Sequence, residues 1–172
     1  MKPFPLLAVA ALGVLLSACF TSEAPRFPFS SAVAAFGNGG RYRVYEHASG
    51  KYYHQGPLVV KRLTDGSYEF GTDKDPLQIS FHDIGNGVIV GQARNMSPDD
   101  KRQPYGYSIL TQKGLELFLH APQCDKQDPT MLAAYRVVLL AENECSVDGV
   151  KESAKLFAAI SAGEPTFKFV PE

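Results

Sequence analysis

The sequence predicts a β-rich domain, all-β or α+β, in which about seven antiparallel strands form a meander or barrel-like sheet followed by one or two C-terminal helices. Hydrophobic and polar residues alternate with a period of two between Arg41 and His120, and turn residues interrupt this alternation at short intervals. Beyond residue 120 the spacing becomes helical. The 172 residues, 45% hydrophobic and 20% charged, have an ordinary globular composition.

The first eighteen residues have the layout of a secretory signal peptide. Met1 and Lys2 form a charged start, and the apolar run Leu6–Leu16 that follows has 11 residues. A membrane-spanning helix needs roughly 20 such residues. The segment 1–18 is therefore expected to be removed and not to become part of the fold.

The residues that end this segment, Leu16-Ser17-Ala18-Cys19, resemble the lipobox of bacterial lipoproteins, in which Leu and two small residues precede a Cys that receives lipid. The resemblance implies cleavage before Cys19, a diacylglyceryl group on its thiol and usually N-acylation of the freed amine. Acyl chains of this kind anchor a protein stably to a membrane surface. Phe20 stands where the family's inner-membrane retention signal has Asp, so the resemblance favours the outer membrane, with the protein facing the periplasm.

Residues 19–40 are expected to form a lipidated tether, followed by a single domain over 41–172. The segment 20–40 mixes Pro, Ser, Gly and small residues without a sustained period. Its Phe27, Phe29 and Phe36 are able to dock on the domain or on lipid headgroups.

Two stretches show the strand pattern most clearly. Leu77, Ile79 and Phe81 are expected on a core face opposite Gln78, Ser80 and His82, and Leu115, Leu117 and Leu119 are expected opposite Glu116, Phe118 and His120. The other predicted strands are 41–47, 57–63, 67–71, 88–90 and 105–110. Asp65-Gly66, Gly85-Asn86-Gly87 and Gln112-Lys113-Gly114 supply hairpin turns. Neighbouring strands are expected to pair, and both closure into a barrel and curling around a helix remain open.

The C-terminal part predicts a helix over 129–141, because Asp128-Pro129 has the form of an N-cap followed by Pro at the first helical position. A buried strand remains the alternative there. A second helix is predicted over 150–162, with Asp148 as its cap and Gly163 at its end. The segment 166–170 is expected to add an edge strand.

Three cysteines occur in the chain. With Cys19 acylated, Cys124 and Cys145 remain as an even pair in a compartment where disulfides persist, so the two are expected to be bonded. A closed loop of this length stabilises a fold by about 3 kcal/mol on the chain-entropy account.

The sequence offers no catalytic residue, metal site or cofactor. His47, His54, His82 and His120 have no metal-ligand spacing, and His82 and His120 are expected to be solvated. No serine lies in a Gly-x-Ser-x-Gly frame. With 17 Lys and Arg against 18 Asp and Glu, the chain lacks the basic character of a nucleic-acid-binding protein. An enzyme is the least favoured class.

Tyrosines are the most suggestive side chains, because Tyr is enriched in recognition surfaces as well as in strands. Tyr42, Tyr68, Tyr105 and Tyr107 are the candidate ligand-binding residues. The favoured function is a non-enzymatic, membrane-anchored envelope lipoprotein that binds a protein or envelope component through its sheet face. The alternatives are a lipocalin-like carrier of a small apolar ligand, although the chain has no Trp and no Gly-x-Trp signature, and a hydrolase inhibitor, a role found among small disulfide-bonded β lipoproteins.

Overall fold

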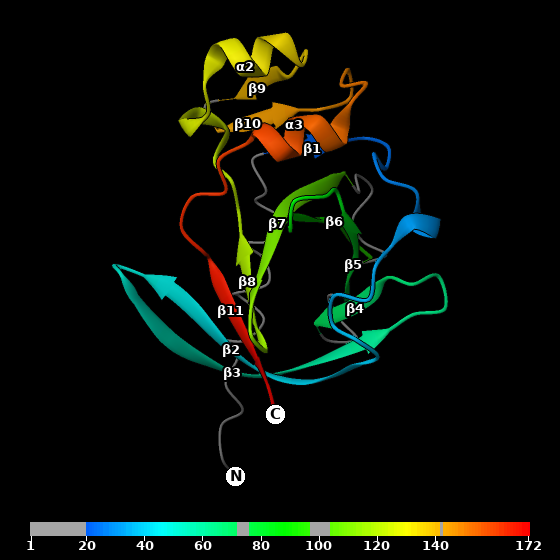
Figure 1. Ribbon diagram of the computed structural model, residues 1–172, viewed down its shortest axis with the longest axis vertical. Helices are drawn as coiled ribbons and strands as arrows, with labels where there is room; N and C mark the ends of the chain where they lie inside the picture. Colours follow the sequence, from blue (N-terminus) through cyan, green and yellow to red (C-terminus); the bar gives the residue numbers. More distant parts are fainter. Residues whose placement is uncertain (1–19, 72–75, 97–103, 142) are drawn as a thin grey trace.

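The structure of the chain is a computed structural model that describes residues 20–71, 76–96, 104–141 and 143–172. The expected signal segment 1–18 and the expected lipidation site Cys19 lie outside the described residues. The described part contains a closed antiparallel β-barrel with a smaller layer of strands and helices against one end, drawn at the top of Figure 1.

Eight strands form the barrel. They are β2 (Gly39–Ala48), β3 (Lys51–Arg62), β4 (Tyr68–Gly71), β5 (Pro76–Asp83), β6 (Ile89–Asn95), β7 (Tyr105–Lys113), β8 (Glu116–His120) and β11 (Phe167–Pro171). From β2 to β8 each strand pairs with the next in the chain, and β11 pairs with β2 on one side and β8 on the other. The β6–β7 pairing makes the ring continuous, so none of these strands is left as an open edge.

The seven predicted strands and their meander are confirmed. An eighth strand closes this meander into a barrel. The sequence predicted an edge strand at 166–170, but β11 lies in the middle of the sheet, where it closes the barrel. The predicted turns are present, with positive φ at Gly66, Asn86 and Gly114. Leu115 is an exposed turn residue and not a core residue of β8, since the strand starts at Glu116.

Aromatic rings fill the barrel interior. Phe36 lies at the centre of this cluster, with its ring centroid 5.1 to 5.8 Å from the rings of Tyr42, Tyr68, Phe70, Phe81 and Phe169. The inward residues of β5, Leu77, Ile79 and Phe81, are buried as predicted, as are Leu117 and Leu119 of β8. We call this cluster the barrel core.

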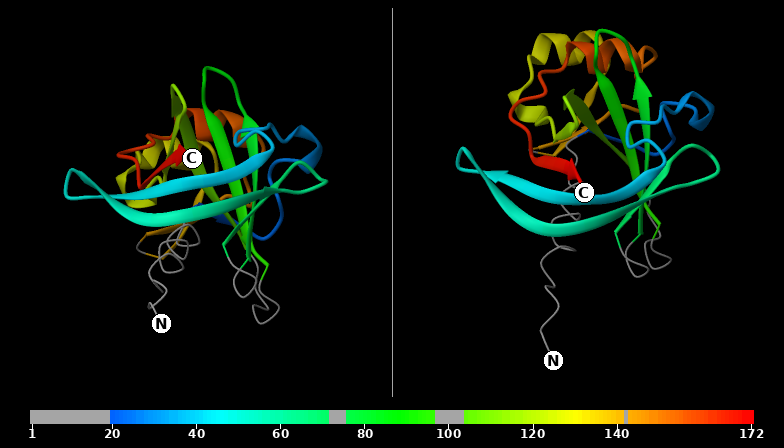
Figure 2. Two further views of the ribbon diagram at one scale, coloured as in Figure 1. Left: turned by 90° about the horizontal axis from the view of Figure 1, so that it is seen from below. Right: turned by 60° about the horizontal axis from the view of Figure 1, so that its bottom comes forward.

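The second layer, here the annex, comprises three short strands, two α-helices and two 3-10 turns. The strands are β1 (Phe20–Ser22), β9 (Val138–Ala141) and β10 (Glu144–Ser146); the helices are α2 (Pro129–Ala134) and α3 (Ser153–Ala159); the 3-10 turns are η1 (Phe29–Ser31) and η2 (Cys124–Lys126). Strand β1 pairs with β7, and β10 and β9 follow it in the sheet. Figure 2 shows the annex from two further directions.

A second cluster of buried residues joins the annex to the outer face of β6 and β7. Phe20, Val147, Leu156 and Phe157 of the annex pack there with outward residues of the barrel wall such as Tyr107. We call this cluster the annex core. The predicted disulfide lies within it, with the Cα atoms of Cys124 and Cys145 6.1 Å apart.

The described part of the expected tether belongs to the fold. Phe20 is fully buried in the annex core, Phe27 packs in the same cluster, and Phe36 is the central ring of the barrel core. Large apolar side chains are thus distributed along a segment whose Pro and Gly content resembles that of a linker. Burying these rings contributes more than the ordering of the segment costs.

The C-terminal helices are shorter than the sequence predicts. The segment 129–141 is helical only as far as Ala134, and β9 follows after Arg136 with φ of 61°. The alternative of a buried strand is also wrong, because β9 is exposed along its length. Asp128 caps α2 as predicted, accepting hydrogen bonds from the amides of Thr130 and Met131. Helix α3 covers only Ser153–Ala159. The expected cap Asp148 instead accepts hydrogen bonds from the amide of Glu23 and the hydroxyl of Ser146.

Candidate functional site

The structure divides the four candidate tyrosines into two pairs on opposite sides of the barrel wall. Tyr42 and Tyr68 point inward, where their hydroxyls donate to the carbonyls of Phe36 at 3.3 Å and Gly37 at 2.7 Å. Burial raises the pKa of both phenols. Each pair is packed into a core, so the four rings do not line one common pocket.

Tyr105 and Tyr107 point outward into the annex core. The Tyr107 hydroxyl lies 2.6 Å from the hydroxyl of Ser22, and burial raises its pKa to about 12. Arg94 donates to the Tyr105 hydroxyl at 3.3 Å. The Tyr107 hydroxyl thus connects β7 to the annex, and the Tyr105 hydroxyl connects β7 to β6; a hydrogen-bond partner of this kind is usual for a buried Tyr.

The polar face predicted for β5 is polar but not solvated. Gln78, Ser80 and His82 are all buried. The His82 nitrogens lie 3.0 Å from the Ser31 hydroxyl and 2.8 Å from the Ser80 hydroxyl, and the Phe27 ring stacks on the imidazole. Burial lowers the pKa of His82 to about 4. The prediction of a surface His82 was wrong because a segment about fifty residues earlier in the chain covers this face.

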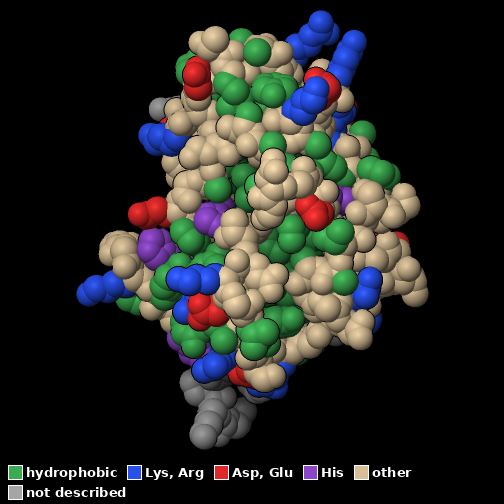
Figure 3. All heavy atoms as spheres, viewed as in Figure 1, with side chains coloured by type: hydrophobic (Ala, Val, Ile, Leu, Met, Phe, Trp, Pro, Cys, Tyr) green, Lys and Arg blue, Asp and Glu red, His purple; other side chains and the backbone are tan. Residues whose placement is uncertain are grey.

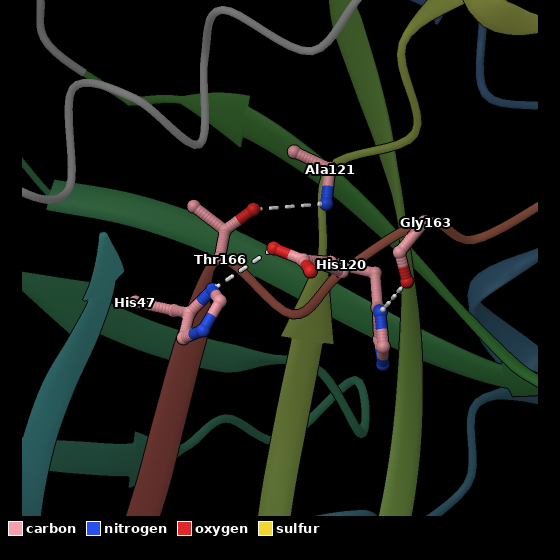
Figure 4. Close-up of polar contacts among 6 residues, drawn as sticks. His47, His120, Ala121, Gly163 and Thr166 are labelled. Atoms are coloured by element: carbon pink, nitrogen blue, oxygen red, sulfur yellow. Dashed lines mark hydrogen bonds and ion pairs between the residues drawn. The ribbon is translucent and has the colours of Figure 1, made fainter. Parts of the chain in front are cut away.

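His120 is also buried, against the prediction. Its Nδ1 donates to the Gly163 carbonyl at 3.1 Å (Figure 4). In the neutral ring its Nε2 therefore accepts from the Thr111 hydroxyl at 3.0 Å. Burial lowers the pKa of this imidazole, which favours the neutral form. With both ring nitrogens engaged by the fold, His120 acts as a structural residue of the loop before β11.

A different set of half-buried and exposed side chains forms an aromatic cluster on the outside of the barrel. Along the outer face of the barrel, His54 of β3 pairs with Tyr45 of β2, Tyr45 pairs with Lys168 of β11, and Lys168 pairs with Phe118 of β8. His47 and Tyr52 form the neighbouring pair, with ring centroids 4.9 Å apart. We call these six residues, Tyr45, His47, Tyr52, His54, Phe118 and Lys168, the aromatic row.

A β-bulge creates this arrangement. The register of β2 against β3 shifts between Val44 and Tyr45, opposite Gly56, whose φ is 121°. Beyond the bulge the faces of β3 are exchanged, because its side chains otherwise alternate strictly. Tyr52 and His54 therefore join Tyr45 on the outer face, and the hairpin extends beyond the barrel wall (Figure 1).

Lys168 organises the centre of the row. Its ammonium lies 4.9 Å from the ring centroids of both Tyr45 and Tyr52, and 3.4 Å from a carboxylate oxygen of Glu116. Cation–π contacts of this kind stabilise ring positions by about 0.5–2 kcal/mol. The two rings are thereby held in place before any partner binds, which reduces the entropy lost on binding.

The row continues into a polar hollow. Glu164, in the loop before β11, lies 3.6 Å from His47 Nδ1, and Thr166 accepts from the Ala121 amide (Figure 4). Lys126, Gln127, Glu164 and Thr166 are among the residues lining a cavity of about 310 Å³ there. Figure 3 shows histidine and hydrophobic side chains close together on this side of the molecule, over the hairpin and the start of β11.

The sequence predicted other tyrosines than those of this site, since Tyr45 and Tyr52 are not among the four candidates. A signal for the bulge was Gly56, directly before the predicted strand 57–63, because Gly in or beside a strand often marks a bulge. Lys168 could not be assigned, because its neighbours on β2 and β8 are set by the closure of the barrel. Within the described ranges, no three His, Cys, Asp or Glu side chains are grouped so as to hold a metal ion.

No described helix has the length and apolar character needed to cross a membrane. Comparisons of the chain with known protein families, with curated proteins and with solved structures found no match.

Proposed function

We propose that this protein is a lipoprotein of the bacterial envelope, held by lipid on Cys19 at the periplasm-facing side of the outer membrane. There it binds a protein or envelope component, without enzymatic activity, through the aromatic row. The lipobox-like sequence ending at Cys19 supports the anchor. The observation behind the binding role is the contact of Lys168 with two rings at the surface, the half-buried Tyr45 of β2 and the exposed Tyr52 of β3.

Several features of the row suit it to recognition. Tyr side chains are enriched among the residues that dominate binding energy, because they contribute large contact area at low entropic cost. Tyr52 is 39% exposed in a preorganised position. Glu116, Glu164 and Lys126 lie near the rings, and the Lys168 ammonium lies between two of them. The patch therefore combines aromatic contact area with charges of both signs, as protein interfaces do.

A lipocalin-like carrier remains the alternative, because an eight-stranded barrel is compatible with that role. The packing of Phe36 against five other rings favours the binding module over the carrier. Native and denatured masses of the purified protein separate the two. A stoichiometric small molecule lost on denaturation would move the carrier to first place. A hydrolase inhibitor would be one form of the proposed protein-binding role.

The binding role is tested by cross-linking in the native host. A photoreactive amino acid placed at His54, an exposed position of the row, is expected to give a discrete adduct with the partner. Tyr52→Ala is expected to reduce this adduct at least tenfold, the effect of losing about 1.4 kcal/mol of binding energy.

The neighbouring Tyr53 provides the matched control. It is 49% exposed but pairs with Glu46 on the opposite face of the hairpin. Tyr53→Ala is expected to change the adduct less than twofold. Equal losses in the two variants, or no adduct from His54, would contradict the row as the binding surface. Unchanged mass of a Cys19→Ala variant relative to the wild type, apart from the substitution, would contradict the anchor.

A further inference from the structure

The outer strand of the annex is unusually apolar for an exposed element. Val138, Leu139 and Leu140 of β9 are 55%, 64% and 57% exposed. Strand β9 is the last strand of the described sheet and pairs only with β10. Side chains alternate along a strand, so Val138 and Leu140 point to one face and Leu139 to the other, and β9 is apolar on both faces. An exposed apolar edge strand of this kind is typical of a surface that contacts another apolar phase. We call these three residues the β9 strip.

The register of the annex brings this strip close to the start of the described chain. Phe20 pairs with Cys145, and Cys145 pairs with Leu139. Two strand spacings of about 4.8 Å therefore separate the backbones of Phe20 and Leu139, or roughly 10 Å. Since Cys19 immediately precedes Phe20 in the sequence, a lipid on Cys19 would hold β9 beside the bilayer.

We propose that the β9 strip lies in the headgroup–acyl boundary of the membrane that holds the anchor. This inference rests on the proposed lipidation of Cys19. An anchored annex meets the bilayer continually, whereas a protein partner has to diffuse to it. At this shallow depth the unpaired backbone groups of β9 remain within reach of water, which they would lose in the hydrocarbon interior.

The charged side chains near the strip are of both signs, because the exposed Arg136 lies two residues before the strip and three carboxylates lie close to Leu140. Glu23, Glu144 and Asp148 line a hollow of about 730 Å³ that Leu140 also borders. These carboxylates would be repelled by anionic lipid, but they suit the ammonium groups of zwitterionic headgroups. Membrane contact through β9 is therefore expected in zwitterionic vesicles, with little dependence on salt.

Membrane contact through the annex would also orient the proposed binding surface. The annex occupies one end of the molecule, and the β2–β3 hairpin lies towards the other (Figure 1). With β9 on the lipid, the aromatic row stands away from the bilayer, accessible from the periplasm. The lipid attachment then adjoins the annex, whereas the six residues of the aromatic row lie on β2, β3, β8 and β11 of the barrel.

The absence of Trp from the sequence permits a direct test. Leu139→Trp in the full-length, lipidated protein introduces a single indole, which is measured in phosphatidylcholine vesicles with and without brominated acyl chains. Bromine quenches only nearby indoles, and we expect at least a twofold loss of emission. Val59→Trp is the matched control, since Val59 is 62% exposed but lies on β3, with β2, β11, β8 and β7 between it and β1. Its emission is expected to change by less than a tenth.

The intact mass of the same sample separates the possible failures. An acylated Leu139→Trp protein whose indole is not quenched would overturn membrane contact through β9 and leave the anchor intact. A protein without acyl chains would overturn both proposals. Equal quenching in the two Trp variants would also overturn the specific contact. Leu139→Ser provides a second measurement: a concentration-dependent dimer of the wild type in detergent that this variant loses would overturn the membrane contact and assign the strip to a second copy of the chain.

Discussion

The barrel core and the annex core lie on opposite faces of the same strands, yet they are built in different ways. In β7, Leu110 points into the barrel and Ile109 into the annex. The barrel core is assembled chiefly from strands that are neighbours in the chain, together with Phe36 and β11. The annex core joins β1, the β10 region and α3, and more than a hundred residues separate β1 from the other two. The alternation of side chains in a strand therefore shows that the strand has two faces. It does not show which segment of the chain covers the face that points away from the barrel core.

Hydrogen bonds between side chains and backbone connect the annex to the barrel wall. Gln92 of β6 accepts from the amides of Arg26 at 2.7 Å and Phe27 at 3.0 Å, and donates to the Phe27 carbonyl at 3.1 Å. Among the described residues, no buried side-chain nitrogen or oxygen lacks a hydrogen-bond partner. A polar outer face is thereby covered without leaving unpaired polar groups, which would cost about 1–3 kcal/mol each.

The largest expected effect comes from Phe36, the central ring of the barrel core. Phe36→Ala removes a fully enclosed ring that contacts five aromatic neighbours and leaves a cavity among them. The free energy of unfolding is expected to fall by about 3–5 kcal/mol in denaturant titrations. Leu115→Ala, at an exposed turn position, is the control and should change it by about 0.5 kcal/mol or less. A loss below about 1 kcal/mol for Phe36→Ala would show that the ring is not a core residue.

Removal of the disulfide tests whether the annex is a separate unit. Replacing Cys124 and Cys145 with Ser releases a closure spanning 21 residues and is expected to lower the free energy of unfolding by about 3 kcal/mol. Hydrogen exchange should accelerate mainly in β10 and α2, with β4 and β5 retaining their protection. Equal loss of protection in all four elements would indicate that the two cores unfold as one.

The smallest expected change in the free energy of unfolding comes from His82, at the boundary between the two cores, and it depends on pH. The unfolded state protonates His82 near pH 6.5, but burial holds the folded pKa near 4. The unfolded state therefore binds more protons between these values, and stability falls as the pH is lowered. We expect the free energy of unfolding to fall by about 2 kcal/mol from pH 7 to pH 5 on this account.

His82→Gln provides the comparison, because it removes the titrating group and keeps a side chain able to hydrogen-bond. The variant should lose most of this slope in denaturant titrations at successive pH values. Burial also lowers the pKa of His120, so a weaker dependence of the free energy of unfolding on pH is expected to remain in the variant. A wild-type stability that is constant from pH 7 to pH 5 would contradict the burial of His82.

The sequence predicted those parts of the molecule that depend on local spacing. The alternation at Leu77, Ile79 and Phe81 located β5 and its inward face, and Asp128-Pro129 located the start of α2. It did not predict the aromatic row. That site needs β11 between β2 and β8 and a bulge opposite Gly56, and both depend on partners that are distant in the chain.

The sequence alone determined the β-rich meander, its turns and the pairing of Cys124 with Cys145, because side-chain alternation, positive-φ turn residues and cysteine number are local or countable properties. Only the tertiary structure decided that residues 20–36 belong to the fold, that His82 and His120 are buried, and that Lys168 lies between Tyr45 and Tyr52. Each of these depends on which distant segment covers a given face, and that choice is made by the packing of the whole chain.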